Sequence, residues 1–177
     1  MSAASDIRLI VSDVDGVWTR GTILYGEANE LKEFSIRDGL GVKIAQHAGI
    51  SIAVITSRSS KALERRCREL GVSDVIQGAA DKLVEMNALA SRLGLTSSQI
   101  CYVGDDLPDL APILAAAISA APSDAAPEVL DAVTWKLQAR GGEGALRELV
   151  ERLLKERGDW SSIVQGFRSG DLKPANP

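Results

Sequence analysis

The chain has 177 residues, 45% of them hydrophobic and 25% charged, which is the size and composition of one globular domain rather than of a disordered polypeptide. Its net charge of −4 excludes a nucleic-acid-binding protein that depends on a broad basic face, and an aromatic content of 4% leaves few rings to stack on bases. We therefore expect one domain with no nucleic-acid partner.

Cysteine spacing and apolar stretches bear on where the chain works. Its two cysteines, Cys67 and Cys101, show neither CxxC nor Cys/His spacing, so they predict no disulfide framework and no zinc site and favour a reducing compartment. Residues 1–6 lack the basic start and apolar core of a secretory signal. The longest apolar stretch, residues 110–122, is interrupted by proline and serine and is too short to span a bilayer. We expect a cytoplasmic protein with no membrane partner.

The first elements in chain order are a strand and a hairpin. Residues 7–16 are rich in β-branched residues and end in two aspartates and a glycine, which predicts a buried strand that enters a loop. Residues 21–25 and 31–35 are strand-like pieces on either side of turn-forming residues at 26–29, so they predict a hairpin over about residues 21–35. This hairpin is too small to be a domain.

Strands and helices then alternate along the chain. Asp38 is the expected N-terminal cap of a helix that runs to Ala48, and Ser59 or Ser60 is the expected cap of the next helix. The later helices are predicted at about residues 83–93 and 146–154, and the strands at residues 50–56, 75–77, 99–103, 118–121 and 133–136.

This alternation predicts a three-layer α/β/α domain, in which a mostly parallel sheet is covered by helices on both faces. We assign residues 1–157 to this domain. Residues 158–177, rich in glycine, serine, aspartate and proline, are predicted to form a flexible arm. The residues that would anchor it on another surface are Trp160, Ile163, Val164 and Phe167. Ligands bind such sheets beyond the carboxyl ends of the strands, so the residues that follow the strands form the candidate site.

Polar side chains follow several of the predicted strands. They are Asp13 and Asp15 after the first strand, Thr56 after the second, Lys82 at the start of a later helix, and Asp105, Asp106 and Asp109 after the strand at 99–103. Carboxylates crowded into one crevice repel one another unless a cation offsets their charge, and oxygen ligands favour a hard ion such as Mg²⁺. Mg²⁺ is commonly shared between one or two carboxylates and a substrate phosphate. The sequence thus predicts a magnesium site and a phosphorylated substrate.

Four of these residues carry the functional groups that phosphoryl transfer needs. The Asp13 carboxylate is the expected nucleophile, because its attack gives an aspartyl phosphate and splits one hard displacement into two easier ones. Asp15, two positions along, is expected to protonate the leaving alkoxide and then to deprotonate the attacking water. Thr56 and Lys82 are expected to hold the transferred group. Each alone fits a structural role, as a helix cap or a surface lysine, and their order with the acidic motifs indicates catalysis.

The same residues resemble a known family. The segments Asp13-Val14-Asp15-Gly16, Thr56, Lys82 and Gly104-Asp105-Asp106-Leu107-Pro108-Asp109 resemble the four motifs of the haloacid dehalogenase (HAD) superfamily of phosphatases. A finer set, Arg37-Asp38-Gly39, Arg58, Glu64-Arg65-Arg66-Cys67, Gln77-Gly78 and Arg140-Gly141-Gly142-Glu143-Gly144-Ala145, is similar to the 3-deoxy-D-manno-octulosonate 8-phosphate (KDO 8-phosphate) phosphatase family. The resemblance implies a Rossmann-like HAD fold with a small hairpin insertion and no large cap domain. It also implies Mg²⁺-dependent hydrolysis of KDO 8-phosphate to KDO and phosphate in lipopolysaccharide biosynthesis.

The resemblance further implies how the metal would be held. Asp13 and Asp105 would ligate Mg²⁺ through their carboxylates and Asp15 through its backbone carbonyl. Asp106 and Asp109 would not bind the metal directly but would hold its water molecules and Lys82.

Substrate binding is implied for a further group of residues. By the resemblance, Arg58 and Arg66 would bind the carboxylate end of the sugar acid, although Arg-rich helix faces are ordinarily solvated. Ser57 and Gly16 complete the expected substrate-binding set. Ser57 stands where the second motif usually has glycine, and Trp18-Thr19-Arg20 replaces a more usual Leu-Thr/Ser-Asp stretch, so these positions bear on the choice of substrate.

The family architecture implies a homotetramer, in which the hairpin lines the entrance of a neighbour and the C-terminal tail folds over an adjacent active site. Two alternatives stay open. Phosphatases of nine-carbon sugar acids, acting on KDN 9-phosphate or N-acylneuraminate 9-phosphate, share much of the pattern. Related domains also occur as non-catalytic oligomerisation modules fused to sugar-nucleotide synthases, a reading that the intact carboxylate set speaks against. His47, the single histidine, falls late in a predicted helix and is given no catalytic role.

Overall fold

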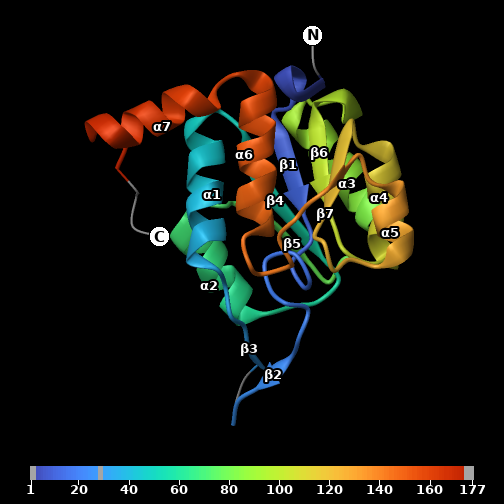
Figure 1. Cartoon of the computed structure of the whole chain (residues 1–177). Helices are drawn as coiled ribbons and strands as arrows, with labels where there is room; N and C mark the ends of the chain where they lie inside the picture. Colours follow the sequence, from blue (N-terminus) through green and yellow to red (C-terminus); the bar gives the residue numbers. More distant parts are fainter. Residues whose placement is uncertain (1–2, 28–29, 174–177) are drawn as a thin grey trace.

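A parallel sheet forms the centre of the molecule (Figure 1). The computed structural model describes residues 3–27 and 30–173, and within these residues six strands pair in the order β5-β4-β1-β6-β7-β8, each parallel to its neighbours. The strands are β1 (Leu9–Ser12), β4 (Ser51–Thr56), β5 (Asp74–Gln77), β6 (Ile100–Val103), β7 (Ile118–Ala121) and β8 (Trp135–Lys136). The predicted parallel sheet is confirmed.

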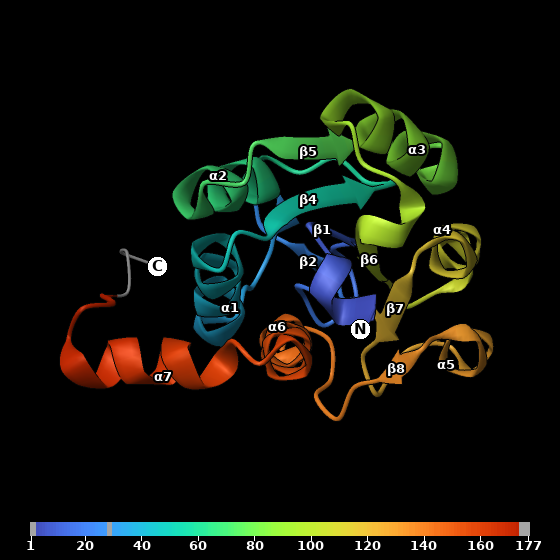
Figure 2. The same cartoon turned by 90° about the horizontal axis from the view of Figure 1, so that it is seen from above.

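Helices cover both faces of this sheet (Figure 2). One layer holds α1 (Ile36–His47), α2 (Lys61–Leu70) and α6 (Ala145–Arg157), and the other holds α3 (Lys82–Leu93), α4 (Leu110–Ala115) and α5 (Pro127–Ala132). Three short 3₁₀ turns are η1 (Ala3–Asp6), η2 (Ser97–Gln99) and η3 (Leu107–Asp109). The three-layer α/β/α architecture is confirmed. The sequence did not predict α4 and α5, because six residues are too few for helical periodicity to emerge.

The strand residues divide between two apolar cores, one on each face. Along β1, Leu9 and Val11 join the core beneath α3, α4 and α5, whereas Ile10 joins the core beneath α1, α2 and α6. Successive side chains of a strand point to opposite faces, so a continuous apolar run is what a strand covered on both sides requires. No helix in the described part of the chain is long and apolar enough to cross a membrane.

The sequence predicted that Asp38 caps α1, and this prediction is wrong. Ser35 occupies the cap position, and its hydroxyl oxygen accepts a hydrogen bond from the backbone N–H of Asp38 at 3.3 Å. The Asp38 carboxylate is buried and accepts instead from the N–H groups of Gly144 and Arg147, at 3.1 and 2.8 Å. Burial raises the pKa of Asp38, while these hydrogen bonds oppose the shift. Asp38 thus caps the start of α6, whose own cap residue Gly144 has no side chain.

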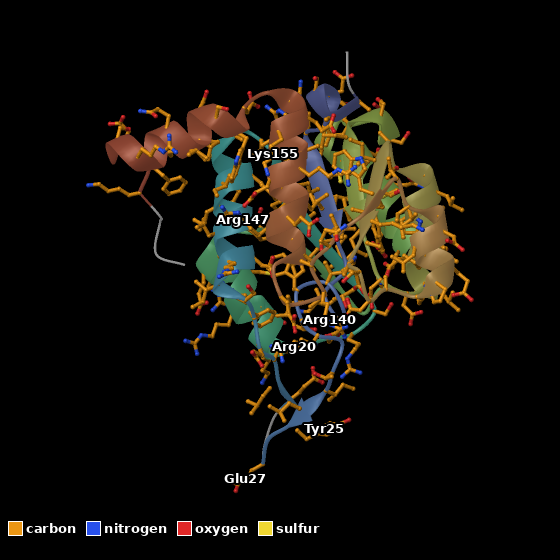
Figure 3. The ribbon with its side chains drawn as sticks, viewed as in Figure 1. Arg20, Tyr25, Glu27, Arg140, Arg147 and Lys155 are labelled. Carbon is orange, nitrogen blue, oxygen red and sulfur yellow. The ribbon has the colours of Figure 1, made fainter. Side chains whose placement is uncertain are left out.

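The predicted hairpin is formed by β2 (Leu24–Tyr25) and β3 (Glu30–Leu31), which pair antiparallel. These strands are shorter than the pieces predicted at 21–25 and 31–35, and half of the predicted turn, residues 28–29, lies outside the described residues. The hairpin extends from the carboxyl edge of the sheet, with Tyr25 and Glu27 at its outer end (Figure 3). Its large apolar residues are solvent-exposed, Tyr25 by 80%.

The C-terminal segment forms a helix where the sequence predicted a flexible arm. Helix α7 (Trp160–Ser169) follows Gly158, which ends α6 in a left-handed conformation. Ile163 is buried, and Trp160 and Phe167 pack against the core on the α1 side. Apolar residues at i, i+3 and i+7 give the segment one apolar face, and this periodicity outweighs its glycine and serine content. The last four residues of the predicted arm, 174–177, lie outside the described part of the chain.

Candidate active site

A polar cavity opens at the carboxyl edge of the sheet. It brings together all the residues that the sequence singled out for chemistry there except Gly16 and Arg66. Its lining residues are Asp13, Asp15, Gly21, Thr56, Ser57, Arg58, Lys82, Asp105, Asp106, Pro108 and Asp109. These residues belong to segments that are far apart in sequence, so the fold brings them together.

The strand order explains why these residues meet. Strand β1 pairs with β4 on one side and with β6 on the other, and all three run in the same direction. Asp13 directly follows β1, and its backbone N–H donates to the carbonyl of Val103 at 3.0 Å. Thr56 is the last residue of β4, and Asp105 lies two residues beyond β6. The Asp13 carboxylate therefore lies between the groups that follow the two neighbouring strands.

Asp13 and Asp105 have the features of metal ligands. Together with Asp109, each offers a carboxylate oxygen within 4.8 Å of the others. One oxygen of Asp13 and one of Asp105, both Oδ1, are buried and find no hydrogen-bond partner among the described residues. Buried oxygens without a donor are costly unless a cation or water contacts them, and a pair of carboxylates suits Mg²⁺. These two residues therefore fit the predicted magnesium site.

Asp109 belongs to the same cluster but is already fully engaged. Its Oδ1 accepts from the Tyr102 hydroxyl at 2.6 Å and from Lys82 Nζ at 2.7 Å. Its Oδ2 accepts from the backbone N–H groups of Asp105 and Asp106, at 3.2 and 3.4 Å. Asp109 lies close enough to ligate a metal with Asp13 and Asp105. Because four donors already occupy its oxygens, we expect it to hold Lys82 and the loop after β6 and not to bind the metal.

Lys82 is a buried cation between two carboxylates. Asp81 caps α3 by accepting from the N–H groups of Leu83 and Val84, both at 3.0 Å, and so fixes the first turn of the helix. From this turn the Lys82 ammonium reaches Asp109, and it lies 3.1 Å from Asp13 Oδ2. Burial disfavours its charged form, but the two carboxylates outweigh burial and raise the pKa of Lys82.

Burial and crowding raise the pKa values of the acids in this cluster, whereas an ordinary ion pair lowers the pKa of a carboxyl group. Burial, followed by repulsion from Asp109, raises the pKa of Asp13 to about 6 even though Lys82 opposes the shift. Burial and the negative charges of Asp13 and Asp109 raise the pKa of Asp105 to about 8. Without a metal, part of the cluster therefore holds protons near neutral pH.

The raised pKa values predict how pH changes the stability of the metal-free protein. Asp105 titrates near 3.8 when unfolded and near 8 when folded, so its stabilising contribution is fully present below about pH 4. That contribution is lost as pH rises through about 8, because the folded chain must then bury an additional negative charge. We expect Tm in EDTA to fall between about pH 5 and pH 8. Mg²⁺ should raise Tm more at the upper pH, because it competes less with protons for the carboxylates there.

Thermal unfolding with EDTA or Mg²⁺ at both pH values measures this effect. Asp105→Asn should lose most of the rise in Tm that Mg²⁺ produces, whereas the control Asp131→Asn, at an exposed carboxylate, should keep it. An equal Mg²⁺-induced rise at both pH values would contradict the raised pKa of Asp105.

Gly16 lies against the Asp105 carboxylate rather than in the cavity lining. Its φ of 91° is in the left-handed region, and a Cβ there would lie 1.9 Å from Oδ2 of Asp105. A Cβ on Gly141 would in turn lie 1.9 Å from the carbonyl oxygen of Gly16, and the N–H of Gly142 donates to Val17 at 2.9 Å. The glycines at 141 and 142 therefore allow this loop to pack directly against the loop that carries Asp13 and Asp15.

Thr56, Ser57 and Arg58 form one side of the cavity. Thr56 is buried, and its hydroxyl oxygen accepts from the backbone N–H of Arg58 at 3.4 Å. Arg58 is partly exposed, with its Nε 3.5 Å from Asp15 Oδ2 and its Nη2 bonded to Glu30. This side therefore offers hydroxyl, amide and guanidinium donors, which are suited to an anionic ligand.

Arg66 lies away from the polar cavity of its own chain. Its guanidinium is 3.5 Å from Glu69 Oε2 and lies against Gly39, where a Cβ would come within 2.2 Å of Nη2. It lines a separate hollow with Lys32 and Phe34. Within one chain the structure therefore does not bring Arg66 to the predicted substrate site.

Contrary to expectation, Trp18 does not face the cavity, whereas the expected effect of Arg20 on the choice of substrate stays a prediction. Trp18 is 2% exposed, and its indole N–H donates to the Ser12 hydroxyl at 2.9 Å, so it fills the core. Arg20 is exposed, and its Nε lies 3.3 Å from Glu143 at the carboxyl edge of the sheet (Figure 3). Asp106 caps the turn η3, because its side chain accepts from the N–H of Leu107 at 2.8 Å.

Sequence reasoning missed three residues around the cavity. Lys32 and Glu30 reach Asp15 and Arg58 from the hairpin, and Tyr102 supports Asp109 from β6. Glu30 and Lys32 are two positions apart at β3 and directly after it, a spacing that puts side chains on the same side of an extended segment, and this was the available signal for the hairpin pair. Tyr102 was visible as the one polar group within an apolar strand.

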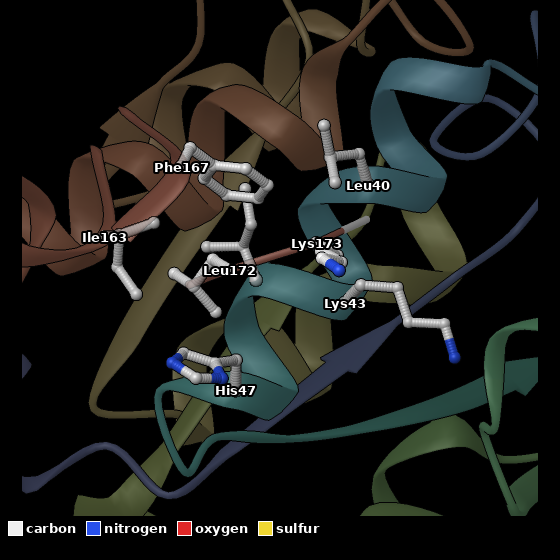
Figure 4. A pocket seen from close by; sticks show the side chains of 8 residues that line it. Leu40, Lys43, His47, Ile163, Phe167, Leu172 and Lys173 are labelled. Carbon is white, nitrogen blue, oxygen red and sulfur yellow. The ribbon is translucent and has the colours of Figure 1, made fainter. Parts of the chain in front are cut away.

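A second cavity lies between α1 and α7 and has a different character (Figure 4). Leu40, Phe167 and Leu172 make its lining largely apolar, with His47 and two lysines around them. No carboxylate lines it, so among the described residues it lacks the ligands for a hard metal ion. His47, the last residue of α1, lines this cavity and not the polar one.

Comparisons with known proteins agree with this geometry. The chain is 38% identical to the 3-deoxy-D-manno-octulosonate 8-phosphate phosphatase KdsC of Escherichia coli over 159 residues, which are 89% of this chain and 85% of that protein. The structure of the corresponding phosphatase from Moraxella catarrhalis, in complex with a magnesium ion, a phosphate ion and a KDO molecule, superposes with a TM-score of 0.91. The two sequences are 36% identical, and the match covers 93% of this chain and 95% of that one.

The cobalt-bound phosphatase of Haemophilus influenzae gives a TM-score of 0.90 at 37% identity, covering 94% of this chain and 99% of that one. No protein-family model matches the chain. These matches in sequence and in fold extend over almost the whole chain, and the chain also has the acidic cavity described above. The chain therefore belongs to the 3-deoxy-D-manno-octulosonate 8-phosphate phosphatase family of the HAD superfamily.

Proposed function

We propose that the chain is a Mg²⁺-dependent phosphatase that hydrolyses KDO 8-phosphate to KDO and inorganic phosphate. The observation that carries this proposal is the pair of partnerless buried oxygens on Asp13 and Asp105, next to the ammonium of Lys82. This arrangement has acceptors for a cation on one side and a fixed positive charge on the other, which together suit a phosphate group. Membership of the phosphatase family supports the same substrate.

In this proposal Asp13 is the nucleophile. One of its oxygens attacks phosphorus, the bond between phosphorus and the sugar oxygen breaks, and Asp15 donates a proton to that leaving oxygen. Asp15 then removes a proton from water, whose oxygen attacks the aspartyl phosphate and releases inorganic phosphate. The Asp13 carboxylate and the protonated Asp15 are thereby regenerated.

The other cavity residues would hold the groups that react. Mg²⁺, held by Asp13, Asp105 and the backbone carbonyl of Asp15, would neutralise charge on the phosphate oxygens. Lys82, Thr56 and Ser57 would bind those oxygens with charged, hydroxyl and amide donors. The residues that would support them are Asp106 and Asp109, with Gly16 giving the loop its close approach to Asp105.

Arg58 is the proposed contact for the carboxylate of the sugar acid. Its guanidinium lines the cavity, forms an ion pair with Asp15 and is hydrogen-bonded to Glu30, so it binds carboxylates in this geometry. We further propose that the enzyme acts in the cytoplasm in lipopolysaccharide biosynthesis, where KDO is used. The phosphatase domain would comprise residues 1–157, and residues 158–177 would form its tail.

A phosphosugar panel tests the proposed substrate. We expect kcat/KM for KDO 8-phosphate to exceed that for arabinose 5-phosphate by about tenfold or more, since arabinose 5-phosphate lacks the carboxylate that Arg58 would bind. It should also exceed kcat/KM for KDN 9-phosphate and N-acetylneuraminate 9-phosphate, whose additional carbon changes the distance between carboxylate and phosphate. EDTA should abolish phosphate release, and excess Mg²⁺ should restore it. A higher kcat/KM for a nine-carbon substrate would contradict the proposed substrate but not the proposed phosphatase mechanism. No phosphate release from any of them would favour a non-catalytic module.

We also propose a homotetramer in which the hairpin and the tail contact neighbouring active sites. The exposed Leu24, Tyr25 and Leu31 support this, because apolar residues gathered on a projecting hairpin favour contact with another surface. The position of Arg66 outside its own cavity is compatible with a role at the site of a neighbour.

Light scattering coupled to size exclusion measures this assembly. The wild-type chain should have four times the monomer mass of 18.8 kDa, and Tyr25→Glu should dissociate it because it places a charge on the exposed apolar tip. Val84→Glu, at an exposed apolar residue on α3, is the matched control and should leave the mass unchanged. A monomeric wild-type protein at micromolar concentration would contradict the proposed tetramer.

A further inference from the structure

Lys32 is a nearly buried cation whose role the proposed mechanism leaves open. Its side chain is only 3% exposed, although the residue lies on the projecting hairpin directly after β3. Its ammonium bonds to Oδ1 of Asp15 and lies 3.2 Å from Oε1 of Glu30. A buried ammonium is stable only when it is paired, so these two carboxylates determine its position.

The contact with Asp15 fixes one oxygen of that carboxylate. Oδ1 of Asp15 accepts hydrogen bonds from the Lys32 ammonium and from the Thr19 hydroxyl, the second at 3.3 Å. Oδ2 of Asp15 lies 3.5 Å from Nε of Arg58. Asp15 and Arg58 line the polar cavity, whereas Lys32 is not among its lining residues. Lys32 therefore contacts the side of Asp15 that faces the hairpin and not the ligand.

The charges in this group balance one another. Two cations, Lys32 and Arg58, contact two carboxylates, Asp15 and Glu30, and Glu30 contacts both cations. Because Glu30 offsets the charge of Lys32, the ammonium can orient Asp15 without leaving an excess positive charge beside it. The pairing also joins the loop after β1 to the hairpin, so the hairpin position sets the orientation of the Asp15 carboxylate.

We propose that Lys32 is a positioning residue for Asp15 and that it fixes the carboxylate in the orientation needed to protonate the leaving group. This inference rests on the proposed function of Asp15 as the acid and base of a phosphatase. A displacement of about 1 Å in a reacting group costs up to about 100-fold in rate, so loss of Lys32 has a large effect when the leaving group needs a proton.

Leaving groups of different basicity test the inference. Lys32→Met should lower the single-turnover rate of phosphoryl transfer from KDO 8-phosphate to Asp13 about 10- to 100-fold and the rate of the same step with p-nitrophenyl phosphate less than about threefold, because p-nitrophenolate leaves without a proton. Lys32→Arg keeps the charge and should recover most of the lost rate. The matched control is Lys43→Met, on α1, whose ammonium extends away from the second cavity (Figure 4) and which should behave as wild type.

A double-mutant cycle separates positioning from a structural or substrate-binding role. In an Asp15→Asn background, Lys32→Met should reduce single-turnover rates no more than about twofold, since its effect passes through the missing carboxylate. The same fold loss in both backgrounds, or equal losses with both substrates in correctly folded protein, would overturn the inference. A rise in KM without a fall in kcat would instead assign Lys32 to substrate binding and also overturn it. Failure of the wild-type chain to hydrolyse either substrate would refute the proposed function itself.

Discussion

Replacing Asp13 by asparagine is expected to lower kcat by at least about 10⁴-fold while the chain remains folded, because the amide cannot form the aspartyl phosphate. The variant should be no less stable than wild type in EDTA. Burial and repulsion from Asp109 raise the pKa of Asp13, so its charge is a burden on the metal-free fold. Lys82 keeps its contact with Asp109 in the variant. Steady-state phosphate release and thermal unfolding measure the two effects.

The control for this variant is Asp124→Asn, at a carboxylate outside the cavity that contacts Arg140 and the N–H of Gly141. It should retain most of the activity. Near-normal turnover by Asp13→Asn would mean that another group attacks phosphorus, and the proposed mechanism would then be wrong. An unfolded Asp13→Asn protein would contradict the electrostatic reasoning about the cluster.

Lys82→Met is expected to cause the largest loss of stability in the site, about 3–5 kcal/mol, because it leaves two buried carboxylates without their cation. The Lys82 side chain is 5% exposed and contacts Asp13 and Asp109, so little water is available to replace it. Catalysis should fall as well, since the charge that is proposed to bind the phosphate is lost. Denaturant unfolding and kcat at saturating Mg²⁺ measure the two losses separately.

A second substitution distinguishes the electrostatic cause from a packing defect. Lys82→Met combined with Asp109→Asn removes one unpaired carboxylate and should recover part of the stability but none of the activity. Met86→Ala, at a buried apolar residue one turn further along α3, should lower stability by leaving a cavity while keeping kcat near wild type. If Lys82→Met were as stable as wild type, the ion pairs would contribute nothing to the fold.

The centre of the site was predictable because its signals are local. Asp13, Thr56 and Asp105 each follow a short run of buried β-forming residues, so each could be assigned to the end of a strand. The parallel order then brings those ends together, because β1 lies between β4 and β6. No residue-specific knowledge of the tertiary contacts was needed for that step.

Residues whose partners lie far along the chain were not predictable in this way. Asp38 carries the local signature of a helix cap, but its carboxylate bonds to Gly144, 106 positions away. Lys32 reads as an ordinary hairpin lysine until the fold brings Asp15 to it. Trp18 follows the loop of Asp13 and Asp15 in sequence, yet packing turns its ring into the core. In each case a tertiary contact, not a local preference, decides the role of the side chain.

Detection of the phosphorylated enzyme tests the central claim most directly. Asp15→Asn should slow attack of water on the aspartyl phosphate, so acid quenching of this variant during turnover of p-nitrophenyl phosphate should preserve the adduct. Mass spectrometry of the peptides should locate one phosphoryl group on Asp13, and its appearance should require Mg²⁺. Burst release of p-nitrophenol without any phosphorylated Asp13, or a phosphoryl group on another residue, would contradict the account.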